Sequence, residues 1–151
     1  AFILAVIVID VLIGATQERA AERTVASLRD VVRTRVRVER DGEGYDVDAE
    51  ELVPGDVLWL ESGARVPADA HLLSSHGLEV DESLLTGESQ AVAKQAASRL
   101  PPETGLAERV NMLHAGSLVT RGRALAVVTV TGTHTAVGHI AAALDAPRAV
   151  K

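Results

Sequence analysis

The sequence predicts a mainly β fold with helices at both ends. Three observations lead to this prediction: helical spacing of apolar residues near the N-terminus, short apolar runs separated by Gly and Pro in the middle, and a helical pattern near the C-terminus. Hydrophobic residues make up 47% of the 151 residues and aromatic residues only 2%, so the core should consist of Val, Leu, Ile and Ala. Many short strands favour a compact β-barrel or jelly-roll-like core with helical attachments.

The first fifteen residues are apolar except for Asp10 and Gly14. A membrane crossing needs about 20 apolar residues, so this run is either the lower part of a transmembrane helix or a buried core helix. We favour the transmembrane helix, because apolar side chains fill nearly every face. From Thr16 the apolar residues recur at helical spacing, at Ala21, Val25, Leu28 and Val32. One continuous helix is therefore predicted over residues 2–31, with an amphipathic stalk as its second part.

Residues 33–39 alternate strictly, which is typical of a half-buried strand. The predicted inward residues are Thr34, Val36 and Val38, and the predicted outward residues are Arg33, Arg35, Arg37 and Glu39. The outward arginines contact either anionic lipid head groups or solvent, and the alternation alone favours neither. A hairpin turn is predicted at residues 41–44.

Turns and short strands fill the middle of the chain. Pro54-Gly55 fits the two central positions of a type II turn, and Gly63 and Pro67 punctuate the next turn. Strands are predicted at 57–60, 70–73, 78–80 and 123–131, and a surface loop or short helix at 95–109. A C-terminal helix is predicted over 135–144, with Thr133 as its N-cap.

The composition excludes several classes of function. The chain has no cysteine, so disulfides, thiolate catalysis and cysteine-based zinc sites are excluded. Lys and Arg number 15 against 21 Asp and Glu, and this net charge of −6 argues against a general nucleic-acid binder.

Isolated polar and aromatic residues are predicted to be structural. The five histidines lack the spacing of a helical metal site and are expected at the surface or in packing; they are His71, His76, His114, His134 and His139. An acidic cluster lacks the spacing of a calcium loop and should be a solvated segment; it contains Asp46, Asp48, Glu50 and Glu51. The single aromatics Phe2, Tyr45 and Trp59 are expected to pack.

The candidate site is the tetrapeptide Thr86-Gly87-Glu88-Ser89, which follows a predicted strand. Gly87 lets the backbone turn sharply and lets another surface approach closely. Glu88 at a loop tip can accept a proton from a water molecule and orient it. From the local chemistry alone, an ordinary solvated turn is the favoured interpretation.

Residues 80–89, Val-Asp-Glu-Ser-Leu-Leu-Thr-Gly-Glu-Ser, closely resemble the signature of the actuator domain of P-type ATPases. Further segments resemble other parts of that domain in the same order, at residues 14–22, 52–57, 66–69, 115–117 and 128–138. The resemblance covers almost the whole chain, with departures at Ala64, Ala91 and Ser117, where the family usually has an acidic residue, Pro and Thr. Residues 66–70 are more similar to calcium, sodium or proton pumps than to heavy-metal pumps.

The resemblance implies three segments. Residues 1–32 would be a truncated transmembrane helix end and a stalk, residues 33–133 a distorted jelly-roll or double-stranded β-helix-like actuator core, and residues 134–151 a return helix. By the match, Glu88 would orient and partly deprotonate the water that attacks an aspartyl phosphate in another domain. Thr86 and Gly87 would shape the loop, and Ser89 would complete the same catalytic site. Rotation of the domain would pull on the stalk and couple hydrolysis to cation transport.

The resemblance also implies partners. These are the phosphorylation and nucleotide-binding domains of the same polypeptide, and a membrane, with the domain on its cytoplasmic face, the plasma membrane being favoured. No Asp-Lys-Thr-Gly motif or P-loop occurs in the sequence, so no cofactor is expected in this fragment, which alone should neither bind ATP tightly nor hydrolyse it. ATP and Mg are expected in other domains.

Two other functions compete with this interpretation. One is a membrane-tethered β-domain that acts only as a protein-binding module, in which the loop from Thr86 to Ser89 would have no catalytic role. The other is a lipid-flipping relative of these pumps. That branch typically has Asp in place of Thr86 and Thr in place of Ser89, so this second alternative is disfavoured.

Overall fold

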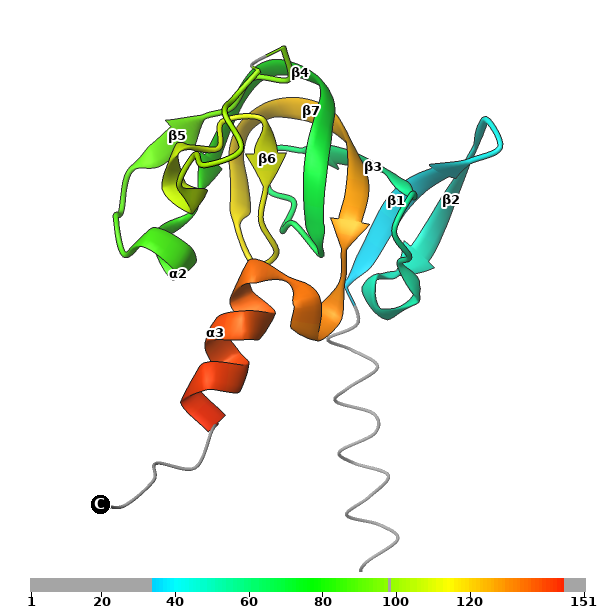
Figure 1. Cartoon of the computed structure of the whole chain (residues 1–151). Helices are drawn as coiled ribbons and strands as arrows, with labels where there is room; N and C mark the ends of the chain where they lie inside the picture. The colour runs from blue at the N-terminus through cyan, green and yellow to red at the C-terminus, as the bar shows by residue number, and fades with distance from the viewer. Residues whose placement is uncertain (1–33, 98, 146–151) are drawn as a thin grey trace, which may run out of the picture. The chain divides into compact units, whose positions relative to one another are not determined.

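The computed structural model describes residues 34–97 and 99–145. The predicted helix at 2–31 therefore lies outside the described residues. Seven strands form one antiparallel sheet in the order β2-β1-β3-β7-β4-β5, and β6 pairs with β4 off this path (Figure 1). The strands are β1 (Arg35–Arg40), β2 (Glu43–Asp48), β3 (Val57–Glu61), β4 (Asp69–Asp81), β5 (Ala91–Ala93), β6 (Met112–Leu113) and β7 (Leu118–Val130).

Two α-helices and three short 3-10 helices accompany the sheet in the described part of the chain. The α-helices are α2 (Ser83–Thr86) and α3 (Ala136–Asp145), and the 3-10 helices are η1 (Ala49–Glu51), η2 (Leu106–Glu108) and η3 (Gly132–His134). The predicted mainly β fold is confirmed; its jelly-roll form stays a prediction. Within residues 34–97 and 99–145, no helix is long and apolar enough to cross a membrane.

Strands β4 and β7 are the longest in the sheet, with 13 residues each. They pair with each other along most of their length through several register shifts. Both strands bend where Gly77 and Gly122 meet, with φ of +55° and +82°, and a Cβ on Gly122 would lie 2.3 Å from the carbonyl oxygen of Gly77. The sequence predicted two separate strands, 70–73 and 78–80, because the polar residues between them interrupt the apolar pattern. Bulges let one bent strand continue through that interruption.

The β1–β2 hairpin closes through Asp41 and Gly42, whose φ angles are 54° and 79°. Arg40 pairs with Glu43, so this is a two-residue loop with both residues in the left-handed region, as a type I′ turn requires. The turn was predicted, but β2 was not, because its residues are mostly exposed and its acidic residues indicated a solvated segment. Thr34 is exposed, contrary to the predicted inward position, since it precedes the first residue of β1.

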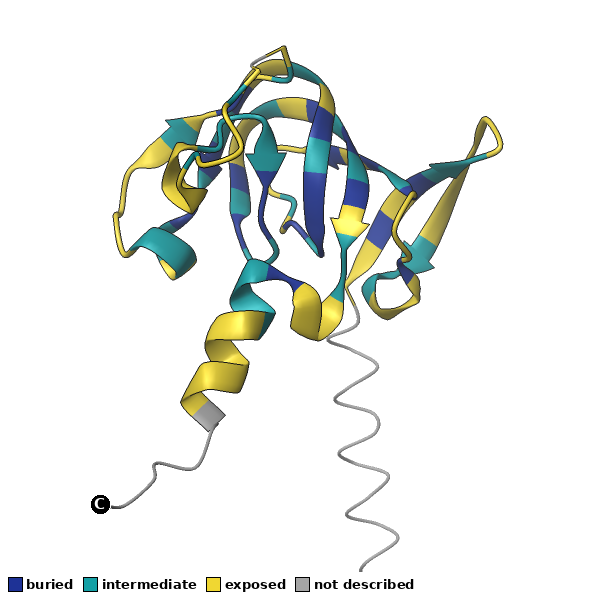
Figure 2. Cartoon of the chain, in the orientation of Figure 1, coloured by how far each residue is buried: buried dark blue, intermediate teal, exposed yellow. Residues whose placement is uncertain are grey.

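The core is aliphatic, as the composition predicted (Figure 2). It comprises Val36, Val38, Leu52, Leu58, Leu60, Val66, Ala68, Ala70, Leu72, Leu78, Val80, Leu113, Val119, Ala124, Ala126 and Val128. Two aromatics expected to pack do not belong to it: Tyr45 is 46% exposed and Trp59 is 50% exposed. Trp59 alternates with the buried Leu58 and Leu60, so it lies on the face of the sheet that points away from the core. Tyr45 pairs with the buried Val38 but lies on the mostly exposed strand β2, where its hydroxyl donates to Glu43.

The predicted type II turn at Pro54-Gly55 is held by a buried carboxylate. Gly55 has φ +100°, and the Asp56 N–H donates to the Val53 carbonyl. The side chain of Asp56 accepts two 2.7 Å hydrogen bonds from Arg40 and a third from the Val53 N–H. These hydrogen bonds from Arg40 hold the pKa of Asp56 below its ordinary value, against the opposing effect of burial.

A second buried carboxylate, Asp69, joins the start of β4 to the C-terminal helix. Its Oδ1 accepts from the Ala115 N–H and its Oδ2 from the Ala136 N–H, both at 2.8 Å. Burial raises the pKa of Asp69, but the nearby His114 ring and these two N–H donors outweigh burial and hold the pKa below its ordinary value. One side chain therefore fixes both the β6–β7 turn and the first turn of α3.

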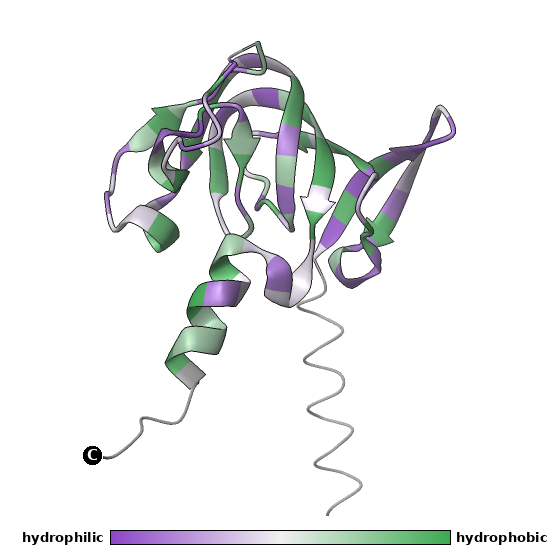
Figure 3. Ribbon diagram, in the orientation of Figure 1, coloured by the Kyte–Doolittle hydropathy of each residue, from purple (hydrophilic) through white to green (hydrophobic). Residues whose placement is uncertain are grey.

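Helix α3 begins one residue later than predicted, and its cap is different. The hydroxyl of Thr135 accepts from the Gly138 N–H at 3.0 Å, which is the bond an N-cap makes. The predicted cap, Thr133, lies in η3 instead. Since both residues are threonines, composition alone could not choose between them. The helix leaves apolar side chains in solvent, with Ile140 46% and Leu144 80% exposed (Figure 3).

We expect Asp69→Asn to lower the free energy of unfolding by about 1–3 kcal/mol, because one of two buried N–H groups loses its acceptor. Since the folded-state pKa is depressed, the charged carboxylate contributes fully above the unfolded pKa of about 3.8 and loses its contribution as the pH falls through the lower folded value. The difference between the native chain and the variant should therefore shrink below about pH 4. Urea unfolding at several pH values measures this.

The matched control is Asp46→Asn on the exposed strand β2. Its effect should stay within about 0.5 kcal/mol, as for most surface substitutions. Equal effects of the two substitutions at pH 7 would contradict the role given to Asp69.

Candidate active-site loop

The predicted site lies at the tip of the connection between β4 and β5. These two strands pair through three residues each, from Glu79↔Ala93 to Asp81↔Ala91. The single-turn helix α2 and the residues 87–90 fill the connection, which stands at the edge of the molecule beside β5 (Figure 1). The sequence predicted a polar turn here, and the structure refines it to one helical turn followed by an exposed loop.

Residues at both ends of α2 explain why it forms and why it stops. At its start, Asp81 Oδ1 accepts from the Ser83 N–H at 2.9 Å, and this bond holds the pKa of Asp81 below its ordinary value. At its end, Gly87 adopts the left-handed conformation, with φ 74° and ψ 0°, and its N–H donates to the Ser83 carbonyl. A glycine in this conformation is the common way to end a helix, so Gly87 ends α2 and directs the chain into the exposed loop at Glu88.

The Thr86 hydroxyl braces the turn that carries Glu88. It donates to the Glu82 carbonyl at 3.2 Å and accepts from the Glu88 N–H at 3.2 Å. Thr86 is half-buried, whereas Gly87, Glu88 and Ser89 are exposed. The backbone at Glu88 is thus tied down, while its carboxylate has no hydrogen bond or ion pair within the described residues.

The four predicted site residues are therefore brought together, with the carboxylate at the surface. An exposed carboxylate on an anchored backbone can meet a group on another surface without breaking internal contacts. A Glu88 buried in the core would have excluded such a role.

A buried ion pair lies beneath the loop. Lys94, just after β5, has its Nζ atom 2.7 Å from Glu82 Oε1, and the two side chains are 0% and 2% exposed. Apart from Lys94, no described group donates to either carboxylate oxygen of Glu82. The Lys94 ammonium also donates to the Arg109 carbonyl at 3.2 Å. The pair joins the residue before α2 to the chain that returns from the loop.

Glu82 also anchors α2 through its backbone. Its carbonyl accepts from the N–H groups of Leu85 and Thr86, as well as from the Thr86 hydroxyl. From the sequence, Lys94 resembles a lysine near the family motif, and a surface ion pair is the alternative interpretation; the surface ion pair is wrong, because Lys94 is buried. The available signal was its position after the small apolar run Ala91-Val92-Ala93, where a lone ammonium needs a buried partner.

A close contact also locates α2 against the β6–β7 turn. Gly116 has φ +87°, and a Cβ there would lie 2.7 Å from Leu84 Cδ2 of α2. A larger residue at Gly116 would force the Leu84 side chain to move and would be strained by the positive φ. The turn at 115–117, which is distant in sequence, thus contacts α2 and helps to position it.

No group of three or more His, Cys, Asp or Glu side chains that could hold a metal ion occurs in the described part of the chain. His114 is buried, His71 is half-buried, and His76, His134 and His139 are exposed.

We expect Lys94→Met to lower the free energy of unfolding by about 3–5 kcal/mol, because it leaves the Glu82 carboxylate buried without a counter-charge. The double variant Glu82→Leu/Lys94→Met should recover most of this loss, since it removes both charges together. Urea unfolding of the native chain, the two single variants and the double variant gives the coupling energy.

The control is Arg121→Ala, which breaks an exposed ion pair with Glu79 and should cost at most about 1 kcal/mol. A cost of Lys94→Met no larger than that of the control would show that the buried pair does not hold the loop.

Comparison with known proteins identifies the family of the domain. The family model for the P-type ATPase actuator domain matches residues 30–145. A calcium-transporting ATPase of Listeria monocytogenes is 44% identical over 147 residues, which cover 97% of this chain and 17% of that protein. A cation-transporting ATPase of Synechocystis is 45% identical over 140 residues, covering 93% of this chain and 15% of that protein.

A solved structure shares the fold. The crystal structure of a zinc-transporting PIB-type ATPase in an E2.Pi state matches with a TM-score of 0.56 and 29% identity, over 78% of this chain and 17% of that one. The chain thus spans less than a fifth of the length of each of these relatives. The fold, the loop and the matched family model together place this chain in the family of P-type ATPase actuator domains.

Proposed function

We propose that this chain is the actuator of a P-type cation-transporting ATPase, and that Glu88 directs the water that hydrolyses an aspartyl phosphate in another domain of the same polypeptide. The observation that carries the proposal is an exposed carboxylate on a backbone held by Gly87 and Thr86. The names of the relatives, which include calcium-transporting and cation-transporting ATPases, support a cation as the transported species.

The proposed chemistry needs little from this chain beyond position. Phosphoryl transfer depends on an in-line nucleophile and on stabilisation of charge, rather than on covalent catalysis. The water oxygen forms a bond to phosphorus as the bond from phosphorus to the aspartyl oxygen breaks. Glu88 accepts the proton of that water, and inorganic phosphate leaves. The anchored turn places the carboxylate before the reaction, which lowers the entropic part of the barrier.

Thr86, Gly87 and Ser89 have supporting roles in this proposal. Thr86 fixes the backbone N–H of Glu88, and Gly87 ends the helix without a side chain in the way, since a Cβ there would meet nothing within 4 Å. That open space lets a phosphate-bearing surface come close to the loop. Ser89 offers an exposed hydroxyl beside the carboxylate.

The other domains of the proposed pump lie outside this chain. ATP and Mg would bind the phosphorylation and nucleotide-binding domains, and this chain would contribute neither. A membrane would be reached through residues 1–32 and through the continuation of α3, and the domain would lie on the cytoplasmic face, at the plasma membrane. The exposed apolar side chains of α3 are consistent with a helix that packs against further segments.

The test is Glu88→Gln in the full-length parent. The phosphoenzyme formed from radiolabelled ATP should still appear, but its decay after a chase should slow by about 10²–10⁴-fold, the usual effect of losing a group that accepts a proton. The amide keeps the shape of the side chain and loses its basicity. Unchanged decay would sink the proposal and favour a tethered protein-binding module.

The matched control is Glu103→Gln, the same chemical change at an exposed position on the loop between β5 and β6. Its phosphoenzyme should decay at the native rate. The two variants should also unfold at the same denaturant concentration, which separates a chemical effect from a folding defect.

A further inference from the structure

A groove lies on the face of the sheet that points away from the core, at a distance along the sheet from the Glu88 loop. It has a volume of 540 Å³ and crosses four neighbouring strands, β1, β3, β7 and β4. One row of paired residues forms its floor: Arg37 pairs with Trp59, Trp59 with Leu125, and Leu125 with Ser74. A second row adds Glu61, Arg123 and His76.

Two arginines line this groove, and each has an acidic cross-strand neighbour, Asp46 for Arg37 and Glu61 for Arg123. Neither Arg37 nor Arg123 forms an ion pair with any residue in the described ranges. The Arg37 guanidinium lies over Gly44 of β2, where a Cβ would come within 3.3 Å of its NH2 nitrogen. The missing side chain at Gly44 leaves room for this arrangement. The planar guanidinium group is suited to bidentate binding of carboxylates.

Trp59 supplies an apolar surface between the charges. It is the only tryptophan in the chain and is 50% exposed. Exposure of so large an apolar side chain to water contributes nothing to the stability of the fold. An exposed tryptophan flanked by arginines is a composition typical of protein-binding surfaces, where these two residues often dominate the affinity. The volume also falls within the usual range for a binding site, about 300–1,000 Å³.

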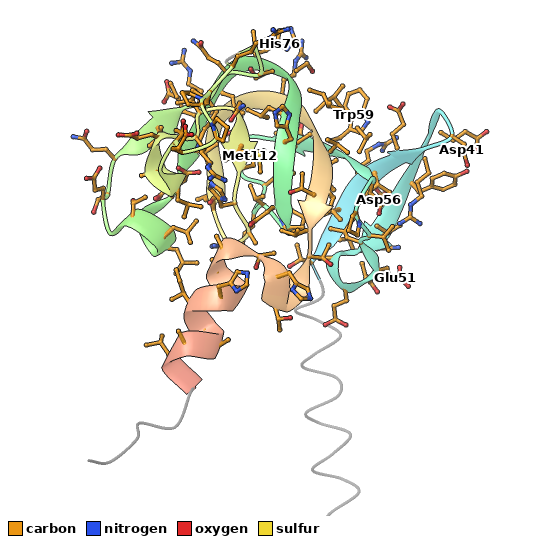
Figure 4. All side chains as sticks on the ribbon, viewed as in Figure 1. Asp41, Glu51, Asp56, Trp59, His76 and Met112 are labelled. Atoms are coloured by element: carbon orange, nitrogen blue, oxygen red, sulfur yellow. The ribbon has the colours of Figure 1, made fainter. Side chains whose placement is uncertain are left out.

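We propose that this groove binds an extended acidic peptide segment, with its carboxylates on Arg37 and Arg123 and an apolar side chain on Trp59. Charge complementarity argues for an acidic partner, since the lining of the groove holds two arginines against one glutamate, in a chain of net charge −6, and neither arginine forms an ion pair with a described residue. Trp59 and His76 lie at the end of the sheet remote from α3 (Figure 4). This position favours a peptide over a lipid surface reached through the helix. The proposal does not depend on the role of Glu88.

Fluorescence of Trp59 tests the proposal directly, because no other tryptophan contributes to the signal. The probe is the acetylated, amidated peptide Glu-Glu-Leu-Glu-Glu, added to the 151-residue chain. We expect a saturable change in emission whose midpoint rises with salt. Arg37→Ala and Arg123→Ala should each weaken binding by about tenfold or more, since a hydrogen bond between charged groups is lost.

Matched variants and probes make the result decisive. Arg121→Ala changes the same charge on the same strand, but outside the groove, and should bind like the native chain. The peptide Lys-Lys-Leu-Lys-Lys should not bind. The proposal is overturned by no saturable change up to about 1 mM acidic peptide, by equal weakening in Arg121→Ala, or by inorganic phosphate or phosphatidylserine vesicles binding as tightly as the peptide.

Discussion

The candidate site depends on one buried charge pair beneath an exposed loop. Glu82 faces inward to Lys94, and its own carbonyl holds the first turn of α2. Burying two charges costs solvation energy that their attraction only partly returns, so such pairs contribute little net stability. What this pair does supply is a single geometry: a carboxylate without another donor accepts only the arrangement that brings Lys94 to it. The loop can thus be exposed and still have one position.

In the segments that resemble the actuator signatures, acidic side chains accept hydrogen bonds from backbone N–H groups. Asp56 satisfies the Val53 N–H and pairs with Arg40, which keeps the Pro54-Gly55 turn against the hairpin. Asp69 satisfies two N–H groups from segments far along the chain. Each of these carboxylates is buried and accepts several hydrogen bonds. Glu88 differs from them in being exposed and unengaged.

Local patterns predicted the parts of the fold that local forces determine. The turns at Asp41-Gly42 and Pro54-Gly55 follow from residues that tolerate left-handed backbone, and the strict alternation at β1 found Val36 and Val38. Long-range packing decided the rest. Strand β2 forms because it pairs with β1. Strand β4 continues through a polar stretch because β7 pairs with it along the bend. Lys94 is buried because it forms an ion pair with the buried Glu82. The loop residues were predicted together, but only family resemblance, and not their chemistry, distinguished them from a plain turn.

Strand β4 has a mechanical consequence. Its first residue, Asp69, holds the first N–H of α3, and its last residue, Asp81, holds the first N–H of α2. At about 3.3 Å per residue, this one strand links the two helices over a contour of roughly 40 Å, and its pairing with β7 stiffens it along the way. A force applied at the loop would therefore be transmitted to α3 along the paired strand β4, with little deformation inside the domain. Compliance would have to reside where the domain joins its neighbours.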